Sequence, residues 1–301
     1  MRAIAAPASL KGVLSAVAGA DALADGLRVG GAEAVAMPVA DGGDGTLEVL
    51  SRALGGDWRE AEVSAPIGGT VRARWLLLPN DKSSQGARAV VESAQVLGFQ
   101  TVSQLDPLRA SSRGLGELIL AAAPEAETLL VCLGGTVTVD GGAGMRDVLD
   151  ELPLPTRVAC DVLSPLLDAA YVFAKQKGAS YEQLDELAER LRGLPEVPGA
   201  GAAGGLGGAF AALGAELVPG AALVLDEIGF DPRGYDLVVT GEGAVDETTW
   251  AGKAPGEVVR RCRDAGVRCE LFSARDDLSG DPSRAREDLV ELGERLARQF
   301  A

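Results

Sequence analysis

The sequence predicts an α/β fold in which a domain with a parallel sheet is interrupted by a second, inserted α/β domain. Near both ends of the chain, short apolar runs typical of buried strands alternate with stretches of helical periodicity. From Asp57 the pattern changes to two runs with partial alternation, which is typical of an antiparallel hairpin. A length of 301 residues allows one large or two medium domains with a sizeable core.

The first part of the chain is expected to form a strand, a helix, a second strand and a second helix. Residues 3–7 are a short apolar run, and leucines and valines then recur at near-helical spacing until Gly30 and Gly31 end the helix. Residues 33–40 are expected to form the second strand and residues 46–54 the second helix. This order is typical of a parallel sheet with crossover helices.

The middle of the chain is expected to form the inserted domain. Gly68 and Gly69 predict the turn of a hairpin, and residues 87–94 and 128–135 predict further strands. Helices are expected over residues 111–123, capped by Ser111 or Ser112, and after a capping-box pattern of Ser180 and Gln183.

The end of the chain returns to the α/β pattern. It predicts a strand over residues 235–243, a helix after Pro255, a strand over residues 268–274 and a final helix that begins at Asp281 and Pro282. The predicted domains are therefore residues 1–64 plus 232–301, and an inserted domain of residues 65–231.

Composition excludes several classes of function. A net charge of −16 and a pI of about 4.5 argue against nucleic acid or an anionic membrane as partner. The chain has no histidine, which excludes histidine-based triads and imidazole metal ligands, so that a metal would be an oxygen-ligated ion such as Mg²⁺. The cysteines have no C-x-x-C spacing and are expected to be buried, reduced thiols: Cys132, Cys160, Cys262 and Cys269. Lys11 interrupts the apolar N-terminal run, so a cytoplasmic protein is expected rather than a secreted one.

Lysine is rare in this chain and is concentrated in a few segments. Only five of the 28 basic residues are lysines, and four of these lie in glycine-bearing or strand-end segments: Lys11, Lys175, Lys177 and Lys253. Because lysine commonly contacts phosphate as a compact point charge, we expect these four to serve one site for a phosphorylated ligand.

The first two candidate loops follow the first two predicted strands. Ser9 and Lys11 follow the first strand, where a lysine could reach a phosphate or a carboxylate; the alternative is a surface lysine beside a helix. The second loop, Asp41 to Gly45, includes Gly42, Gly43 and Gly45. Its aspartates could bind Mg²⁺ or accept a proton from a hydroxyl, whereas the alternative is an ordinary Asp-Gly turn.

Three further loops are rich in glycine. The loop after residues 128–133 offers backbone N–H donors, hydroxyls and one acid, in Gly134, Gly135, Thr136, Asp140, Gly141 and Gly142. A second, from Gly199 to Gly204, matches the spacing of a dinucleotide-binding fingerprint. That fingerprint requires a preceding strand, and Pro195 and Pro198 stand where the strand would be. The remaining interpretations of this loop are tight backbone packing or a contact with phosphate. The last follows residues 235–240 and includes Gly241, Glu242, Gly243, Asp246 and Lys253, which suit a metal–phosphate or substrate contact or else a salt-bridged turn. No Walker-type phosphate loop is present.

These motifs, taken in order, resemble those of the bacterial glycerate kinase family. The matching stretches run from residue 3 to about residue 256: AP-S-KG, MPVADGGDGT, LGGTVTVDGGAGM, ACDV-SPLL, QKGA, PGAGAAGGLG and DLVVTGEGAVDETTWAGKAP. The resemblance implies a flavodoxin-like (Rossmann-like) domain with a second α/β domain inserted into it and an active site in the cleft between them. It further implies transfer of the γ-phosphoryl group of ATP, with Mg²⁺, to D-glycerate, with 2-phosphoglycerate favoured as the product.

The resemblance also suggests roles for individual residues. Lys11 would contact phosphate or the substrate carboxylate, and Lys253 would be a second cation. Asp41 and Asp140 are candidates for binding Mg²⁺ or for accepting the glycerate proton. The partner expected is a small hydroxy acid, and a homodimer is compatible with the sequence.

Several positions depart from the family pattern. The family has an acid at Ala8, an aromatic residue at Leu10, Thr at Leu115, Asn at Val139, Arg at Ala244 and Gln at Thr248. Because several of these changes replace a polar residue with an apolar one, an alternative is a catalytically weakened paralogue that binds nucleotide or a hydroxy acid as a sensor or partner protein. A nicotinamide oxidoreductase is disfavoured by the missing strand before Gly199.

Overall fold

The computed structural model describes residues 1–79 and 86–300, which form two compact units. Unit 1 comprises Met1–Asp41, Glu48–Ala53 and Ala221–Ala301, and unit 2 comprises Gly42–Leu47 and Leu54–Gly220. Each unit has its own sheet and its own hydrophobic core.

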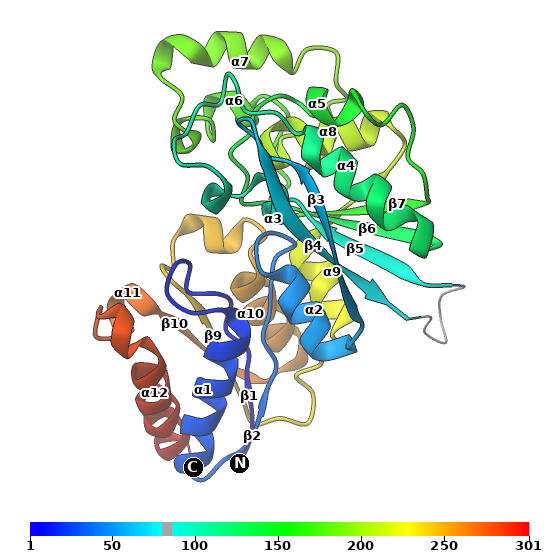
Figure 1. Ribbon diagram of the computed structural model, residues 1–301. Coiled ribbons are helices and arrows are strands. Elements are labelled where there is room, and N and C mark those ends of the chain that lie inside the picture. Colours follow the sequence, from blue (N-terminus) through cyan, green and yellow to red (C-terminus); the bar gives the residue numbers. More distant parts are fainter. Residues whose placement is uncertain (80–85, 301) are drawn as a thin grey trace. The chain divides into compact units, whose positions relative to one another are not determined.

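Unit 1 is built on a parallel sheet of four strands in the order β10-β9-β1-β2 (Figure 1). The strands are β1 (Arg2–Ala5), β2 (Glu33–Ala36), β9 (Leu237–Glu242) and β10 (Arg268–Ser273). Helices α1 (Ala16–Val29) and α12 (Ala285–Gln299) lie side by side on one face, and α9 (Gly220–Glu227) and α10 (Ala254–Ala265) cover the other.

The alternation of side chains along β1 explains why both faces of this sheet are covered. Ala3 and Ala5 belong to the core under α1 and α12, whereas Ile4 and Ala6 belong to the core under α9 and α10. Successive strand residues point to opposite faces, so a continuous apolar run produces two buried faces.

Unit 2 has a mixed sheet of six strands in the order β3-β4-β5-β6-β7-β8. The strands are β3 (Asp57–Ser64), β4 (Thr70–Leu78), β5 (Arg88–Glu92), β6 (Thr128–Leu133), β7 (Thr156–Cys160) and β8 (Glu216–Pro219). The first three pair antiparallel, and β5 to β8 pair parallel. The helices are α3 (Ala94–Leu97), α4 (Arg113–Ala122), α5 (Ala143–Arg146), α6 (Asp168–Tyr171), α7 (Leu184–Arg190) and α8 (Ala202–Ala212).

The predicted α/β fold class is confirmed, and most predicted elements are present. The hairpin turn at Gly68 and Gly69 joins β3 and β4 with Ser64 opposite Thr70. Residues 46–54 form α2 (Thr46–Leu54), and Ser180 with Gln183 forms the predicted capping box before α7. Strands β7 and β8 were not predicted, because their runs are short and interrupted by charged residues.

The unit boundaries differ from those expected at residues 64 and 231. Strand β3 pairs with β4 along its whole length, from Asp57 with Leu77 to Ser64 with Thr70, so it belongs to the sheet of unit 2. Helix α9 belongs to unit 1 because Ala221 and Leu225 pack in the core of that unit.

The cysteines are free thiols in the structure. Cys132, Cys160 and Cys262 are buried, as expected from their apolar surroundings, whereas Cys269 is half-buried. No helix in the described part of the chain has the length and apolar character that a membrane span requires.

Candidate active site

Three predicted site segments of unit 1 follow strands of one parallel sheet, namely β1, β2 and β9. Ser9 and Lys11 follow β1, and Lys11 is exposed in the turn that Leu10 and Leu14 close by hydrogen bonds. Residues 37–39 continue alongside β1 and lead to the half-buried Asp41. The N–H of Ala8 donates to the carbonyl of Gly241 at 2.9 Å, which ties the first of these loops to the end of β9. In open α/β sheets, ligands usually bind at the carboxyl ends of the parallel strands.

At the end of β9, Glu242 organises a polar cluster. The Lys253 Nζ lies 3.1 Å from Glu242 Oε2, and the Thr249 hydroxyl donates to Glu242 Oε1 at 2.5 Å. The Asp246 carboxylate lies 3.9 Å from Lys253 Nζ and caps η5 (Glu247–Trp250). Hydrogen bonding from the Thr248 side chain lowers the pKa of Asp246 below its ordinary value. Lys253 therefore stands at the start of α10 with a carboxylate partner already in place.

The glycines around this cluster have different roles. The Phe272 ring packs against Gly241, where it leaves no room for a Cβ atom. Gly243 is half-buried, has open space around it and accepts a hydrogen bond from the N–H of Arg275. Gly241 thus serves packing, whereas Gly243 is the glycine next to which a ligand has room.

In unit 2, the loop of residues 42–45 lies against the ends of the parallel strands. Gly42 and Gly45 have positive φ angles of 90° and 89°. A Cβ on Gly134 would lie 2.7 Å from the Cα of Gly43 and 2.5 Å from Asp161 Oδ2. Only glycine at position 134 permits this close approach of the loop and the carboxylate.

Glu92, at the end of β5, occupies the N-terminus of α2, where an anion could otherwise bind. Its Oε2 atom accepts a hydrogen bond from the N–H of Leu47 at 3.0 Å, and its Oε1 atom has no hydrogen-bond partner among the described residues. Burial, with a smaller contribution from the negative charge of Asp44, raises the pKa of Glu92 to about 7. Because the protein's own acid occupies this helix N-terminus, a phosphate at the same place is disfavoured.

The loop after β6 is fixed by neighbouring residues. Ser93 Oγ lies 3.1 Å from both the N and the O of Gly134, and the N–H of Val137 donates to the carbonyl of Leu97 at 2.8 Å. Gly135, with a φ of 65°, lies beside Asp44.

Asp140 is enclosed by hydrogen-bond donors. Its Oδ2 atom accepts from the N–H and the hydroxyl of Ser112, both at 2.8 Å, and from the N–H of Gly144 at 3.1 Å. Its Oδ1 atom accepts from the N–H of Gly142 at 3.1 Å. Ser111 or Ser112 was expected to cap α4. Ser112 is the N-cap residue, but its hydroxyl donates to Asp140, while Ser111 Oγ accepts the N–H of Arg113 at 3.2 Å. This environment favours a structural role for Asp140 over that of a metal ligand or proton acceptor.

The glycine-rich stretch before and within α8 serves close packing. Ala203, Gly204 and Gly205 all have positive φ angles, and the carbonyl of Gly204 accepts the N–H of Gly141 at 3.1 Å. A Cβ on Gly204 would collide with the carbonyl oxygen of Thr138. No strand directly precedes Gly199 in the structure, so the fingerprint-like spacing reflects backbone packing against the loop of residues 138–142.

The four lysines expected in one site are divided between the units. Lys11 and Lys253 belong to unit 1, whereas Lys175 and Lys177 belong to unit 2. The Lys175 ammonium lies 3.7 Å from the centre of the Tyr181 ring, while Lys177 is buried.

Two carboxylates at strand ends of unit 2, Glu92 and Asp161, were missed in the sequence, and only their position after apolar runs could have indicated them. Lys177 was expected to contact a phosphorylated ligand, but its side chain is buried and bonds to Thr136 and Thr138.

Most departures from the family pattern lie in the hydrophobic cores. Val139 and Leu115 are fully buried in the core of unit 2, and Leu10 is buried in that of unit 1. Ala8 is half-buried and packs against the core beneath α10, Ala244 is half-buried, and Thr248 is exposed. These apolar residues contribute packing, so the weakened-paralogue alternative, which rested on lost ligand contacts, is not supported.

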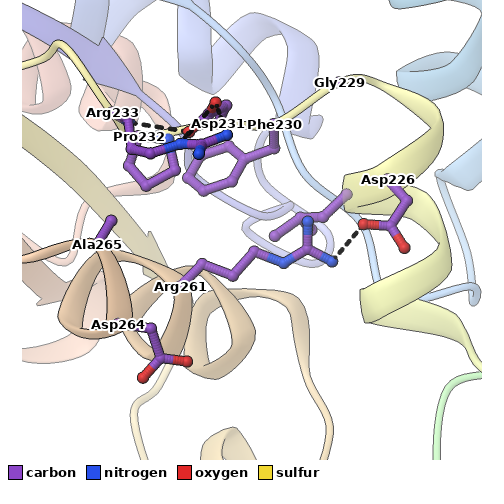
Figure 2. A pocket seen from close by; sticks show the side chains of 10 residues that line it. Asp226, Gly229, Phe230, Asp231, Pro232, Arg233, Arg261, Asp264 and Ala265 are labelled. Atoms are coloured by element: carbon purple, nitrogen blue, oxygen red, sulfur yellow. Dashed lines mark hydrogen bonds and ion pairs between the residues drawn. The ribbon is translucent and has the colours of Figure 1, made fainter.

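A cavity of about 500 Å³ lies at the opposite, amino-terminal edge of the sheet of unit 1 (Figure 2). Its walls include the residues before β9 and before β10. Arg261 pairs with Asp226 at 2.7 Å, and Arg233 pairs with Asp231, as Figure 2 shows. Because the cavity is remote from the strand-end loops of its unit, it is not the candidate active site.

The acids differ in how well they fit a metal ion. In residues 1–79 and 86–300, no group of three acid or thiol side chains is placed to hold a metal ion alone. Mg²⁺ in phosphoryl-transfer sites commonly uses one or two carboxylates together with substrate phosphates and water. The half-buried Asp41 fits that requirement, whereas the enclosed Asp140 does not.

Comparison with known proteins agrees with these motifs. Residues 3–155 and 152–287 match the glycerate kinase family. The chain is 36% identical to glycerate 2-kinase of Escherichia coli K12, over 85% of this chain and 80% of that protein. It is 35% identical to glycerate kinase of Bacillus subtilis 168, over 89% of this chain and 83% of that protein.

A solved structure supports the same assignment. A crystal structure from Salmonella typhimurium LT2, assigned as a glycerate kinase 2, superposes with a TM-score of 0.77 at 29% identity. The match covers 99% of this chain and 98% of that one. Because the family match extends over nearly the whole chain and the fold is that of the Salmonella structure, the chain belongs to the glycerate kinase family.

Proposed function

We propose that the protein is an ATP-dependent glycerate kinase that transfers the γ-phosphoryl group to D-glycerate. The observation that carries the proposal is family membership together with retention of the glycine-rich, charged loops at the strand ends of both units. The E. coli relative is a glycerate 2-kinase, which favours 2-phosphoglycerate as the product.

Lys11 and Lys253 are the proposed cations for the anionic substrates. Both substrates carry negative charge, and the overall charge of −16 requires that positive charge be supplied locally. Lys11 is exposed at the end of β1, and the Lys253 ammonium is held by Glu242 at the start of α10. Phosphoryl transfer depends mainly on positioning and charge neutralisation, so it needs no histidine.

Asp41 is the proposed acid of the reaction. Its carboxylate could bind Mg²⁺ or accept the proton of the attacking hydroxyl, and the enclosure of Asp140 favours Asp41 for both roles. When bound, Mg²⁺ would neutralise charge on the nucleotide phosphates.

The glycine loops are proposed to position the substrates by backbone N–H groups. Gly135 and Thr136 donate no backbone N–H bond to another residue in the described part of the chain, which leaves two donors at the end of β6. Adjacent N–H groups of this kind suit an anion such as a phosphate or a carboxylate.

The proposal is tested by measuring ADP formation with ATP, Mg²⁺ and D-glycerate, followed by NMR of the product. The expected product signal is that of a phosphate ester at the 2-hydroxyl. Phosphorylation at the 3-hydroxyl would correct the position assigned here, and a lack of glycerate-dependent ADP formation would contradict the proposed function.

A further inference from the structure

We propose that Lys177 is a positioning residue for phosphoryl transfer, whose buried ammonium fixes the loop of residues 134–138 at the end of β6. The inference rests on the proposed function, because that function assigns this loop to the reaction site.

The contacts of Lys177 place its charge behind the loop. Its side chain comes from η3 (Lys175–Lys177), and the residue is only 4% exposed. The Nζ atom donates to Thr138 O at 2.9 Å and to Thr136 Oγ1 at 3.2 Å. It therefore joins two residues of the loop from the interior and has no access to a ligand in solution.

A lysine at this place is a costly choice for stability alone. Burial penalises the ammonium and lowers the pKa of Lys177 to about 8, while the charges of Asp161 and Asp140 oppose that shift. The partners of the ammonium are neutral oxygens, which compensate a buried charge less well than a carboxylate does. A buried ammonium that bonds only to neutral oxygens is more readily explained by a role in a functional site than by packing.

The loop needs an anchor on this side. Ser93 fixes Gly134, and Leu97 fixes Val137, so both of these contacts come from one segment next to β5. Lys177 supplies an anchor at Thr136 and Thr138 from a segment far along the chain. With all three anchors in place, the N–H groups of Gly135 and Thr136 keep a fixed direction, and a positive charge stands behind them.

Asp161 shares this arrangement. Its Oδ2 atom lies against Gly134, and its charge acts on Lys177. The ammonium therefore also counters a carboxylate that would otherwise repel an anion approaching the loop.

The test compares three variants in an intact chain. Lys177→Met removes the charge, Lys177→Arg keeps it with a larger head group, and Lys175→Met is the control because Lys175 lies on the same short helix but is exposed. For each variant, hydrogen exchange of residues 134–139, the urea unfolding midpoint, and kcat and KM with ATP and D-glycerate are measured.

We expect Lys177→Met to exchange faster in this loop and to lower kcat by about 10²-fold, with KM changed by no more than about threefold. Lys177→Arg is expected to fall between it and the wild type, about tenfold below the wild type in kcat, because it keeps the charge but not the geometry. Lys175→Met should match the wild type in loop exchange, because its exposed side chain does not anchor the loop.

A folded Lys177→Met protein with wild-type exchange in this loop would overturn the positioning role, whether or not the wild type phosphorylates glycerate. If Lys177→Met does not fold, wild-type exchange and kcat in Lys177→Arg would overturn the role, because the charge would then be needed only for folding. A wild-type protein that forms no ADP in response to glycerate would instead overturn the proposed function. The two outcomes are distinguishable, because hydrogen exchange of the loop is measured without turnover.

Discussion

Two buried carboxylates of unit 2 are held in opposite ways. Asp140 accepts four hydrogen bonds from Ser112, Gly142 and Gly144, so its side chain is fixed in place. Glu92 accepts a hydrogen bond from the N–H of Leu47, and burial raises its pKa to about 7. Asp140 is therefore held rigidly by its donors, whereas Glu92 changes its protonation state near neutral pH.

Replacement of Glu92 tests this difference through the pH dependence of stability. The raised pKa means that the folded state holds the proton up to about pH 7, while an unfolded glutamic acid releases it near 4.5. The stabilisation from the bound proton is complete below the unfolded pKa and is lost as the pH rises through 7. From pH 5 to 8 we expect the wild type to lose about 3 kcal/mol more unfolding free energy than Glu92→Gln does. Urea unfolding at both pH values measures this, and equal losses in the two proteins would show that Glu92 is ionised throughout.

Lys11 is expected to act in the reaction and not in the fold. In Lys11→Met we expect transition-state stabilisation to fall by about 2–4 kcal/mol, the order found when one electrostatic contact is removed from a preorganised site. The unfolding midpoint should change little, because Lys11 is exposed. Measurements of kcat/KM and of urea unfolding separate the two effects, and wild-type turnover in the variant would refute the assignment.

Val139 tests whether departures from the family pattern are packing residues. Because Val139 is fully buried in the core of unit 2, Val139→Asn should lose about 1–3 kcal/mol of unfolding free energy and gain no turnover. Thr248→Gln, which also introduces the family residue but at an exposed position, should change stability by less than about 0.5 kcal/mol. A stable Val139→Asn protein with faster turnover would mean that this position contacts the substrate.

At the scale of elements, sequence patterns predicted where strands and turns lie better than they predicted what each loop residue does. The periodicity of α1 and the glycines between β3 and β4 act locally, so the sequence indicates them directly. The roles of Glu92 and Lys177 depend on partners more than forty residues away, Leu47 and Thr136, and no local pattern encodes such contacts. For the same reason the sequence could not distinguish glycines that pack closely, such as Gly204, from those with space beside them, such as Gly243.

The packing role of the glycine-rich stretch in α8 can be tested with a matched pair. Gly204 and Gly214 both have positive φ angles, but only at Gly204 would a Cβ meet backbone atoms of the loop at Thr138. Both alanine variants should lose about 1 kcal/mol to backbone strain, and Gly204→Ala should lose a further 1–3 kcal/mol or so to overpacking. Equal unfolding free energies for the two variants would contradict the close packing of α8 against this loop.

At the scale of the whole molecule, the proposed function requires local charge that opposes the overall charge. The chain carries 44 acidic and 28 basic residues, yet the proposed substrates are anions. Positive charge at Lys11 and Lys253, backbone N–H groups at Gly135 and Thr136, and the buried Lys177 are the features that favour anions in spite of that balance. Sequence motifs alone identified the family, because they are distributed over most of the chain in both units.

The most direct test of the central claim is the formation of ADP by the purified wild-type protein with D-glycerate as the phosphoryl acceptor. We expect ADP to form only when ATP, Mg²⁺ and D-glycerate are all present, and to stop when the metal is chelated, since phosphoryl transfer relies on neutralising the nucleotide phosphates. We also expect one phosphoglycerate to form for each ADP, with the phosphate on the 2-hydroxyl. Correctly folded protein that binds ATP and D-glycerate but forms no ADP would contradict the account.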